Sequence, residues 1–214
     1  MKTLDELADS YVRTDKKKHG YMPFYDMLFA PIRLSVKKVL EIGINKGDSL
    51  RLWRDFFPSA IVYGWDCSAE CCFQEPRIIS RIVNHDNKPQ VLAELEAIGK
   101  AIDVIIDDGS HWQESQQRLL AWCLPYVAAG GLYVTEDLHA STVPGMFGLK
   151  NDKSNSTYCM FTGLQLNGAV ESACLTDEEK AYIQRVAGRL VLSSSLARVE
   201  NPFKTSIVSA LFKK

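Results

Sequence analysis

The sequence has no excess of charge of either sign and no long apolar run. Lys and Arg number 25 against 26 Asp and Glu, which gives a formal net charge of −1 at pH 7. Such a balance supplies no basic field that would hold nucleic acid through counterion release. No apolar stretch approaches the roughly 20 residues of a membrane helix, and residues 1–15 lack the apolar core of a secretion signal. We therefore expect a cytoplasmic protein with no nucleic-acid partner and no membrane span.

Paired cysteines and nucleotide-binding glycine motifs are also lacking. The six cysteines do not form C-x-x-C pairs, which disfavours a zinc site. Their one cluster, Cys67, Cys71 and Cys72, has a spacing that would allow a metal site with His85, but packing of free thiols is the simpler interpretation. The absence of G-x-G-x-x-G and of G-x-x-x-x-G-K-[ST] disfavours a dehydrogenase and a triphosphate-binding enzyme. A chain of 214 residues without repeats is expected to form one domain over residues 1–214.

Short apolar runs alternate with helical periodicity through the first two thirds of the chain. The pattern predicts strands at residues 36–43, 60–66, 77–83, 102–107 and 132–135. It predicts helices at residues 47–57, 85–100 and 114–127, the last of which is ended by Gly130-Gly131. Strands that alternate with helices over short connections favour an α/β fold, with a parallel sheet covered by helices on both faces.

The remaining segments give weaker patterns. Residues 1–35 carry a helical start and a loop that must pack on the core, and residues 140–156 are rich in Gly, Ser, Asn and Pro and are expected to form a lid loop. Helices are expected at 158–173 and 176–187, the second with Thr176 and Glu179 as a capping box. Residues 188–201 are interpreted as two strands around a serine-rich turn, and residues 202–214 as a surface segment, with docking on a neighbouring subunit as the alternative.

Acidic residues occur at the carboxyl ends of all five predicted strands, where ligands bind in parallel α/β sheets. In chain order these acids are Glu41, Asp66, Asp86, the pair Asp107-Asp108, and the pair Glu136-Asp137. The first strand leads into a turn, Gly43 to Gly47, whose glycines would let the backbone approach a compact ligand. Such a set suits S-adenosylmethionine, with its ammonium near Glu41, its ribose diol on Asp66 and its adenine amino group near Asp86. Alternatively, Gly43 and Gly47 only cap the strand and start the helix.

The acids after the last two strands predict a cation. Asp108, Glu136 and Asp137 come from adjacent strand ends, where their oxygens would converge on a hard divalent cation such as Mg²⁺. Without a cation the three carboxylates would repel one another and raise their own pKa values. The alternative, in which Asp108 or Ser110 merely caps the next helix, does not account for the Glu136-Asp137 pair.

His111 is predicted to act as the general base, because it follows Asp108 on the same loop and a neutral imidazole accepts a hydroxyl proton near pH 7. His139, just after the acidic pair, is a second candidate for contact with substrate or metal. His85 and His19 are interpreted as loop histidines that lie in solvent.

Three segments carry a resemblance to a known family: VLEIGINKGDSLRLWRDFFPSAIVYGWD, DVIIDDGSHW and GGLYVTEDL. Together with Thr14-Asp15-Lys16, His19-x-Tyr21 and Tyr25, they resemble the metal-dependent sugar O-methyltransferases of macrolide deoxysugar biosynthesis. The likeness runs from about residue 14 to residue 138. It implies a Rossmann-like class I methyltransferase fold, with a central, mostly parallel seven-stranded sheet and a C-terminal antiparallel strand. It also implies S-adenosylmethionine and Mg²⁺ as cofactors. The oligomeric state of this chain is not inferred from the resemblance.

The resemblance assigns roles to individual residues. It places the metal acids on Asp108, Glu136 and Asp137 and the base on His111, and it implies that the early T-D-K and H-x-Y residues cover cofactor and substrate. The expected cofactor-binding residues are Glu41 and Gly43 at the methionine end, Asp66 at the ribose, Asp86 and Asn87 near the adenine, and further Asn45, Gly47, Ser49, Asp107 and Tyr21.

The acceptor stays open, because the chain after Leu138 matches the family poorly. We expect a small-molecule or glycan acceptor, namely a sugar hydroxyl of a glycosylated natural product, a glycolipid or a polysaccharide precursor, and we allow for a homo-oligomer. The alternatives are a catechol-type O-methyltransferase with an aromatic diol acceptor and a non-catalytic protein that only binds S-adenosylmethionine. An intact acid set beside His111 disfavours the non-catalytic alternative.

Overall fold

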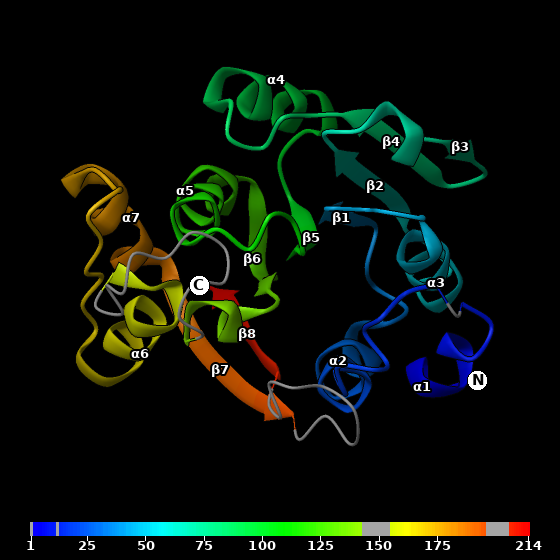
Figure 1. Ribbon diagram of the computed structural model, residues 1–214, viewed down its shortest axis with the longest axis horizontal. Coiled ribbons are helices and arrows are strands. Elements are labelled where there is room, and N and C mark those ends of the chain that lie inside the picture. Colours follow the sequence, from blue (N-terminus) through cyan, green and yellow to red (C-terminus); the bar gives the residue numbers. More distant parts are fainter. Residues whose placement is uncertain (1, 12, 143–154, 196–205) are drawn as a thin grey trace.

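The fold centres on one eight-stranded sheet with strand order β3-β4-β2-β1-β5-β6-β8-β7 (Figure 1). The computed structural model describes residues 2–11, 13–142, 155–195 and 206–214. Strands β4, β2, β1, β5 and β6 run parallel, whereas β3 is antiparallel to β4, and β8 is antiparallel to both β6 and β7. The strands are β1 (Lys38–Ile42), β2 (Ile61–Asp66), β3 (Gln74–Glu75), β4 (Ile78–Ile82), β5 (Ile102–Asp107), β6 (Val127–Thr135), β7 (Ala187–Ser195) and β8 (Ser206–Lys213).

This architecture confirms the predicted α/β class and the predicted mostly parallel sheet. The expected strand number of seven differs by one, because the two-residue strand β3 pairs with the outer edge of β4. Each of the five strands predicted before residue 138 is present, and their parallel registers bring their carboxyl ends to the same edge of the sheet.

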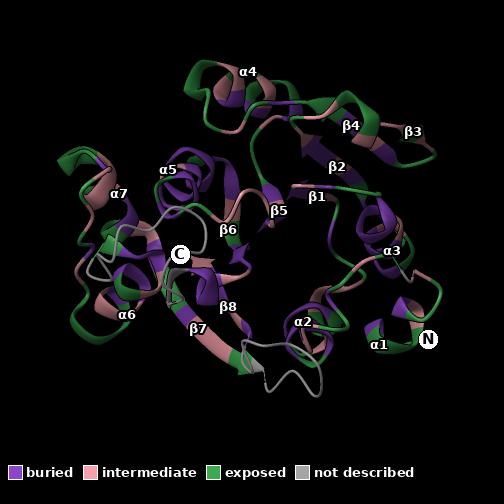
Figure 2. Ribbon diagram, viewed as in Figure 1, coloured by how far each residue is buried: buried purple, intermediate pink, exposed green. Residues whose placement is uncertain are grey.

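Helices cover both faces of the sheet, and Figure 2 shows the buried strands between them. Helices α4, α5, α6 and α7 contribute buried residues to one apolar cluster and α1, α2 and α3 to the other, and the strands between them contribute to both. The helices are α1 (Leu4–Ala8), α2 (Met22–Phe29), α3 (Asp48–Phe56), α4 (Lys88–Ile98), α5 (Gln113–Cys123), α6 (Thr157–Asn167) and α7 (Asp177–Val186). Short 3₁₀ turns lie at Ala30–Ile32, Ala69–Cys71, Leu124–Tyr126 and Leu138–Thr142.

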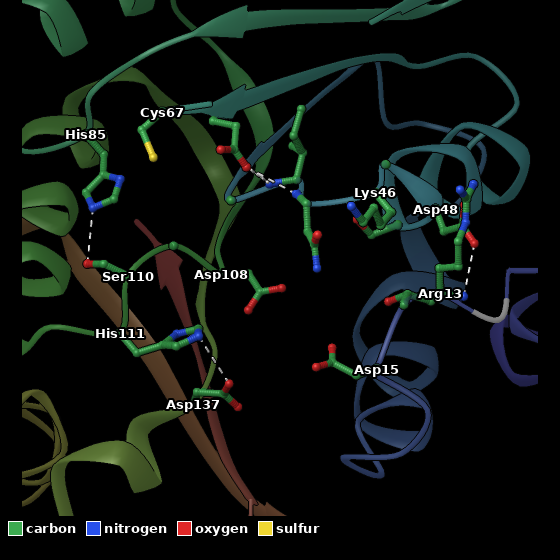
Figure 3. A pocket seen from close by; sticks show the side chains of 18 residues that line it. Arg13, Asp15, Lys46, Asp48, Cys67, His85, Asp108, Ser110, His111 and Asp137 are labelled. Carbon is green, nitrogen blue, oxygen red and sulfur yellow. Dashed lines mark hydrogen bonds and ion pairs between the residues drawn. The ribbon is translucent and has the colours of Figure 1, made fainter. Parts of the chain in front are cut away.

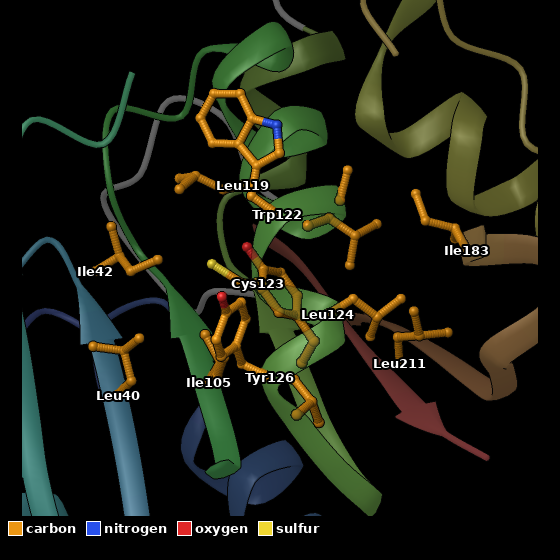
Figure 4. Packing of buried hydrophobic residues seen from close by; sticks show 14 of the residues in the cluster. Leu40, Ile42, Ile105, Leu119, Trp122, Cys123, Leu124, Tyr126, Ile183 and Leu211 are labelled. Atoms are coloured by element: carbon orange, nitrogen blue, oxygen red, sulfur yellow. The ribbon is translucent and has the colours of Figure 1, made fainter. Parts of the chain in front are cut away.

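The central strands are apolar on both faces because both faces are covered. Along β1, Leu40 and Ile42 pack in the cluster of α4–α7, while Val39 packs in that of α1–α3. Figure 4 shows Leu40, Ile42 and Ile105 beneath side chains of α5. The two-residue alternation of a strand therefore serves two separate cores. The N-terminal residues complete the second core, as expected for residues 1–35.

The predicted boundary between the helix at residues 114–127 and the strand at residues 132–135 was wrong. Helix α5 ends at Cys123, and β6 starts at Val127, so Gly130-Gly131 lie inside the strand. Gly130 has a positive φ of 76°, and the register between β5 and β6 shifts between Ile102 and Val104. The glycines thus form an irregularity within a strand instead of ending a helix.

The C-terminal interpretation was also wrong. Residues 187–195 form one strand, β7, in which the serines at 193–195 pair with β8 instead of turning. The expected surface segment contains β8, whose Val208, Ala210 and Leu211 are buried. Polar serines are tolerated in β7 because it is the edge strand of the sheet. Helix α6 also ends earlier than predicted, since Gly168 adopts the left-handed conformation after Asn167.

Most of the expected lid, residues 143–154, lies outside the described residues. No helix in the described part of the chain is both long enough and apolar enough to cross a membrane.

Glu179 ties α7 to the rest of its face and provides a pH-dependent test of the fold. The predicted capping box is present: Glu179 accepts from the Thr176 amide at 3.0 Å, and the Thr176 hydroxyl accepts from the Glu179 amide. Its Oε1 also accepts from Lys88 Nζ at 2.9 Å and from the Trp122 indole at 3.2 Å. Burial opposes the charge, but these donors hold the pKa of Glu179 below its usual value.

Glu179→Gln is therefore expected to lower the free energy of unfolding by about 1–2 kcal/mol at pH 7. A carboxyl whose pKa is lower in the folded state stabilises the fold above its unfolded-state pKa, and this contribution is lost as the pH falls through the folded-state pKa. The difference between the two proteins should thus vanish in acid. Urea denaturation at pH 7 and pH 3 measures it, with the exposed Glu178→Gln as control. A difference independent of pH would contradict the prediction.

Candidate active site

The turn between β1 and α3 is held in a compact shape. Gly43 has a φ of 86°, and a Cβ atom there would lie 2.1 Å from the backbone oxygen of Asp108. Asp66, at the end of β2, accepts hydrogen bonds through Oδ2 from the amides of Ile44 and Asn45, both at 3.1 Å. The turn therefore lies against the ends of both neighbouring strands, and only glycine fits at position 43 without displacement.

A pocket of about 350 Å³ opens beside this turn, which is within the range of small-molecule sites. Figure 3 shows Asp108, His111 and Asp137 on one side of it, and Arg13, Asp15 and Asp48 on the other. The lining residues are Arg13, Thr14, Asp15, Gly43, Ile44, Asn45, Lys46, Gly47, Asp48, Ser49, Asp66, Cys67, His85, Asp108, Gly109, Ser110, His111 and Asp137. The pocket thus combines the glycine turn with the acids and the imidazole at the ends of β5 and β6.

His111 and Asp137 lie next to each other on one side of this pocket. His111 Nε2 lies 3.5 Å from Asp137 Oδ2, as drawn in Figure 3. His111, Asp137 and Asn45 have positive φ angles of 59°, 54° and 42°. Positive φ is uncommon for residues other than glycine and concentrates at functional sites. The structure therefore brings together the predicted base and one predicted metal acid on backbone that is conformationally costly to maintain.

A buried lysine lies behind the acids. Lys16, only 1% exposed, places Nζ at 2.6 Å from Asp108 Oδ2, 2.7 Å from Glu136 Oε1 and 3.1 Å from Glu41 Oε1. The Tyr25 hydroxyl also donates a hydrogen bond to Glu136 Oε1. The cation that the crowded acids require is thus supplied, in part, by the chain itself.

Burial and the charges of this cluster shift the ionisation of its members. Burial opposes the charge on Lys16, but the nearby Asp108, Glu136 and Glu41 raise its pKa well above the usual value. Burial raises the pKa of Asp108 to about 6 against the opposing effect of Lys16. Burial, reinforced by Asp108, also raises the pKa of Glu136. Acids outnumber the cation here, so the cluster retains affinity for further positive charge.

The predicted metal acids occur in three groups of possible metal ligands, two of which share Asp108. Glu41, Asp108 and Glu136 each offer one oxygen within 4.8 Å of the others, and this is the group that Lys16 contacts. Asp108, His111 and Asp137 form a second such group at the pocket. Asp108 belongs to both of these groups, whereas Glu136 belongs to the first alone, and Asp137 belongs to the second and to a third group with His19 and His139. The assignment of all three acids to one metal stays a prediction.

Several predicted cofactor residues line the pocket, and others support it from behind. Gly43, Asn45, Gly47, Ser49 and Asp66 line it. The remaining ones, Glu41, Asp86, Asn87, Asp107 and Tyr21, are not among the described residues that line it.

Each of these supporting residues has a structural partner. Tyr21 donates from its hydroxyl to Asp137 Oδ1 at 2.5 Å. Asp107 lies under the Asp108 loop, where burial raises its pKa to about 7 and the Gly109 amide donates to it. Asp86 accepts from Ser115 in α5, and Asn87 caps α4 by accepting from the Gln90 amide. These contacts hold the strand-end loops in place.

His19 and His85, interpreted as solvent-facing, and His139, the second candidate for contact with substrate or metal, all have partners in the structure. His19 Nδ1 and His139 Nδ1 lie 3.6 Å and 3.7 Å from Asp137 Oδ1. His85 lines the pocket, and its Nε2 forms a hydrogen bond with Ser110 at 3.1 Å. The interpretation of His19 and His85 as solvated loop residues was therefore wrong.

The three clustered cysteines differ in their surroundings. Cys71 and Cys72 pack against the cluster of α1–α3, in line with the packing interpretation. Cys67 is exposed and lines the pocket, so packing does not describe it.

Sequence reasoning missed the residues that the N-terminal segment brings to the site. Lys16 was counted only within a basic run and a family motif, and Arg13 was not considered. Arg13 Nη2 contacts Asp48 Oδ1 at 2.6 Å beside the start of α3. One signal was available for Lys16, since the acids at five strand ends call for nearby positive charge, and T-D-K lies inside the resembling region.

Comparison with known proteins places these features in context. No protein-family model matches the chain. Over 162 residues it is 38% identical to demethylmacrocin O-methyltransferase of Streptomyces fradiae, covering 72% of this chain and 40% of that protein. Over 147 residues it is 35% identical to the 8-demethyl-8-alpha-L-rhamnosyl tetracenomycin-C 2'-O-methyltransferase of Streptomyces olivaceus, covering 65% of this chain and 38% of that protein.

A solved structure extends the likeness over the whole chain. It is that of MycE, the methyltransferase of the mycinamycin pathway in complex with Mg, SAH and mycinamycin VI, with a TM-score of 0.78 and 26% identity. The match covers 99% of this chain and 54% of MycE. The chain spans about two fifths of the length of the two relatives above. It is thus a homologue of the sugar O-methyltransferases of macrolide and tetracenomycin pathways, with the Rossmann-like fold of a class I methyltransferase.

Proposed function

We propose that this chain transfers a methyl group from S-adenosylmethionine to a hydroxyl of a sugar carried by a natural product, a glycolipid or a polysaccharide precursor, with the help of a divalent cation. One observation carries the proposal: the glycine turn at Gly43 and the group formed by Asp108, His111 and Asp137 line the same pocket. A methyl donor and a hydroxyl acceptor need this combination within reach of each other.

The residues of the pocket suit the parts of the methyl donor. The tight turn at Gly43 lets backbone approach a bound ligand closely, because the space that a Cβ would need is already filled by the Asp108 loop. Asp66, held by the amides of Ile44 and Asn45, offers a fixed carboxylate at the end of β2 for a ribose diol. We assign these residues to the cofactor, together with Asn45, Gly47 and Ser49.

His111 is the group that takes the hydroxyl proton. Its Nε2 faces Asp137 Oδ2 at 3.5 Å, and that carboxylate stabilises the imidazolium that forms when the proton is accepted. In the transfer itself the sulfur–carbon bond breaks as the oxygen–carbon bond forms, and the proton passes to His111. The site then holds S-adenosylhomocysteine and the methyl ether.

The donor set fits a divalent cation. Carboxylate oxygens are the ligands that Mg²⁺ prefers, and the carboxylates of Asp108 and Asp137 border the pocket beside His111. When bound, such a cation supplies Lewis acidity that makes the acceptor hydroxyl more acidic. Asp108 and Asp137 would hold it, and Glu136, which is buried beside Lys16 and does not line the pocket, would add negative charge near it.

A sugar acceptor is favoured over a catechol because one relative is named for a rhamnosyl-bearing substrate and MycE was solved in complex with mycinamycin VI. Cytoplasmic location, a single domain over residues 1–214, a homo-oligomeric assembly and the absence of a nucleic-acid partner stay predictions.

Binding and turnover test the proposal separately. We expect S-adenosylhomocysteine to bind in calorimetry and, at about 100 times its dissociation constant, to raise the free energy of unfolding by about 2.7 kcal/mol. With S-adenosylmethionine and MgCl₂, rhamnosylated or deoxysugar-bearing polyketides should yield methyl ethers detectable by mass spectrometry, and excess EDTA should abolish this product.

Glycosides and simple catechols should be assayed side by side. Methylation of catechols alone would replace the sugar assignment, and full turnover in EDTA would remove the cation from the proposal. No binding of S-adenosylhomocysteine would contradict the proposal as a whole.

A further inference from the structure

Lys16 contacts the acids of the site but is not among the residues to which a catalytic, metal or cofactor role was individually assigned. Its ammonium is buried behind the pocket and lies within 3.1 Å of oxygens from Asp108, Glu136 and Glu41. Those acids come from the ends of β1, β5 and β6, whereas Lys16 comes from the N-terminal segment, 92 residues from Asp108 and 120 from Glu136. A lysine is almost never fully buried unless it is paired.

Of the three acids that Lys16 contacts, only Asp108 is accessible from the pocket, with its side chain 21% exposed. The ammonium contacts Oδ2 of Asp108 and Oε1 of Glu136, one oxygen of each carboxylate. Asp108 also borders the pocket, in the group with His111 and Asp137. The lysine and a cation bound in the pocket would therefore share the Asp108 carboxylate.

Two positive charges that share one carboxylate weaken each other's binding. The interaction between charges a few ångströms apart is strong in a site shielded from water, and removal of one partner from a buried ionic cluster leaves the other charges uncompensated. The lysine thus has two effects: it stabilises the acids when no metal is present, and it reduces the affinity for a metal that does bind.

We propose that Lys16 is the resident cation of the active-site acids, which keeps the cluster assembled without metal and weakens the binding of the divalent cation. This inference rests on the proposed function, because it concerns the cation assigned there. Lys16 is on this view a positioning residue, since it acts through Asp108 and Glu136.

The test compares Lys16→Met with Lys17→Met, a neighbour whose exposed ammonium contacts only Asp5 and Asp9 among the described acids. In EDTA we expect Lys16→Met to melt about 10 °C below the wild type. In a titration with MgCl₂, with KCl at matched ionic strength as the reference, we expect Lys16→Met to bind Mg²⁺ about tenfold more tightly. Its melting temperature should also gain more from Mg²⁺ than that of the wild type. Lys17→Met should follow the wild type in both respects.

A second variant covers the case in which Lys16→Met does not fold. Glu41 contacts Lys16 in the cluster. The double variant Lys16→Met/Glu41→Gln removes the negative charge of Glu41 together with the positive charge of Lys16, so fewer buried carboxylates lack a counter-charge than in Lys16→Met. We expect the double variant to be folded and to melt at a higher temperature than Lys16→Met alone, with its response to Mg²⁺ still exceeding that of the wild type. A double variant that is no more stable than Lys16→Met would overturn the proposal.

Equal Mg²⁺ affinity of Lys16→Met and the wild type, including no binding to either, would also overturn it. Binding of S-adenosylhomocysteine to the wild type, measured without metal, reports on the proposed function independently. If that ligand binds and the Mg²⁺ affinities are equal, the inference about Lys16 fails while the methyltransferase assignment stands.

Discussion

Replacement of His111 by asparagine is expected to lower turnover by roughly 10²–10⁴-fold, with the affinity for S-adenosylhomocysteine unchanged. Asparagine removes the proton acceptor but tolerates the positive φ of 59° at this position. The variant therefore separates loss of a base from backbone strain, which alanine would not do. The contact between the imidazole and Asp137 Oδ2 at 3.5 Å is the geometry that would be lost. Initial rates at saturating donor and acceptor measure the effect.

His85→Ala is the matched comparison for this prediction. That imidazole lines the same pocket, but its Nε2 forms a hydrogen bond with Ser110 at 3.1 Å, whereas the imidazole of His111 lies beside Asp137 (Figure 3). We expect its turnover to remain within about tenfold of the wild type. Added imidazole should also restore part of the activity of His111→Ala. Full activity of His111→Asn at neutral pH would remove His111 from the mechanism.

Gly43→Ala is expected to lower the free energy of unfolding by about 2–4 kcal/mol and to abolish binding of S-adenosylhomocysteine. The added Cβ would lie 2.1 Å from the Asp108 oxygen, which is backbone and cannot rotate away as a side chain could. The clash must move either the β1–α3 turn or the Asp108 loop, and both line the pocket. Urea denaturation and calorimetry measure the two effects.

Gly130→Ala controls for the backbone contribution. Gly130 has a positive φ of 76°, but a Cβ there would have nothing within 4 Å. Its replacement should cost only the conformational penalty, about 1 kcal/mol, and leave ligand binding intact. If the two variants were equally stable, the close approach of Gly43 to the Asp108 loop would not be the reason for glycine at this position.

The parallel part of the fold was predictable because each strand there has a local signature. The run Ile102–Asp107 is buried and apolar apart from Asp103 near its start, and it ends in an acid. The glycine turn after β1 and the capping box at Thr176 are also local patterns. Once the strands were recognised and predicted to be parallel, the acids that follow them could be placed at one edge of the sheet.

Features that depend on distant pairing were not predictable in this way. The serines of β7 form a strand only because β8 pairs with them, and the β8 sequence gave no indication that it would lie between β6 and β7. Lys16 is similar, because its partners lie far away in the sequence and its neighbours Lys17 and Lys18 suggested a solvated run. Because Lys16 contacts Glu136 and not Asp137, these two acids belong to different groups in the structure. Their adjacency in the sequence had predicted that they act together.

The order of the last two strands has a consequence for synthesis on the ribosome. Strand β7 is hydrogen-bonded to β8 alone among the described strands, yet β8 follows it in the chain and lies between β7 and β6. A nascent chain that has emerged only as far as β7 cannot add that strand to the sheet, and the edge of β6 stays open until residues 206–213 leave the exit tunnel. The closing of this edge therefore has to wait for β8, and until β8 is available the open edge of β6 is exposed to misassembly.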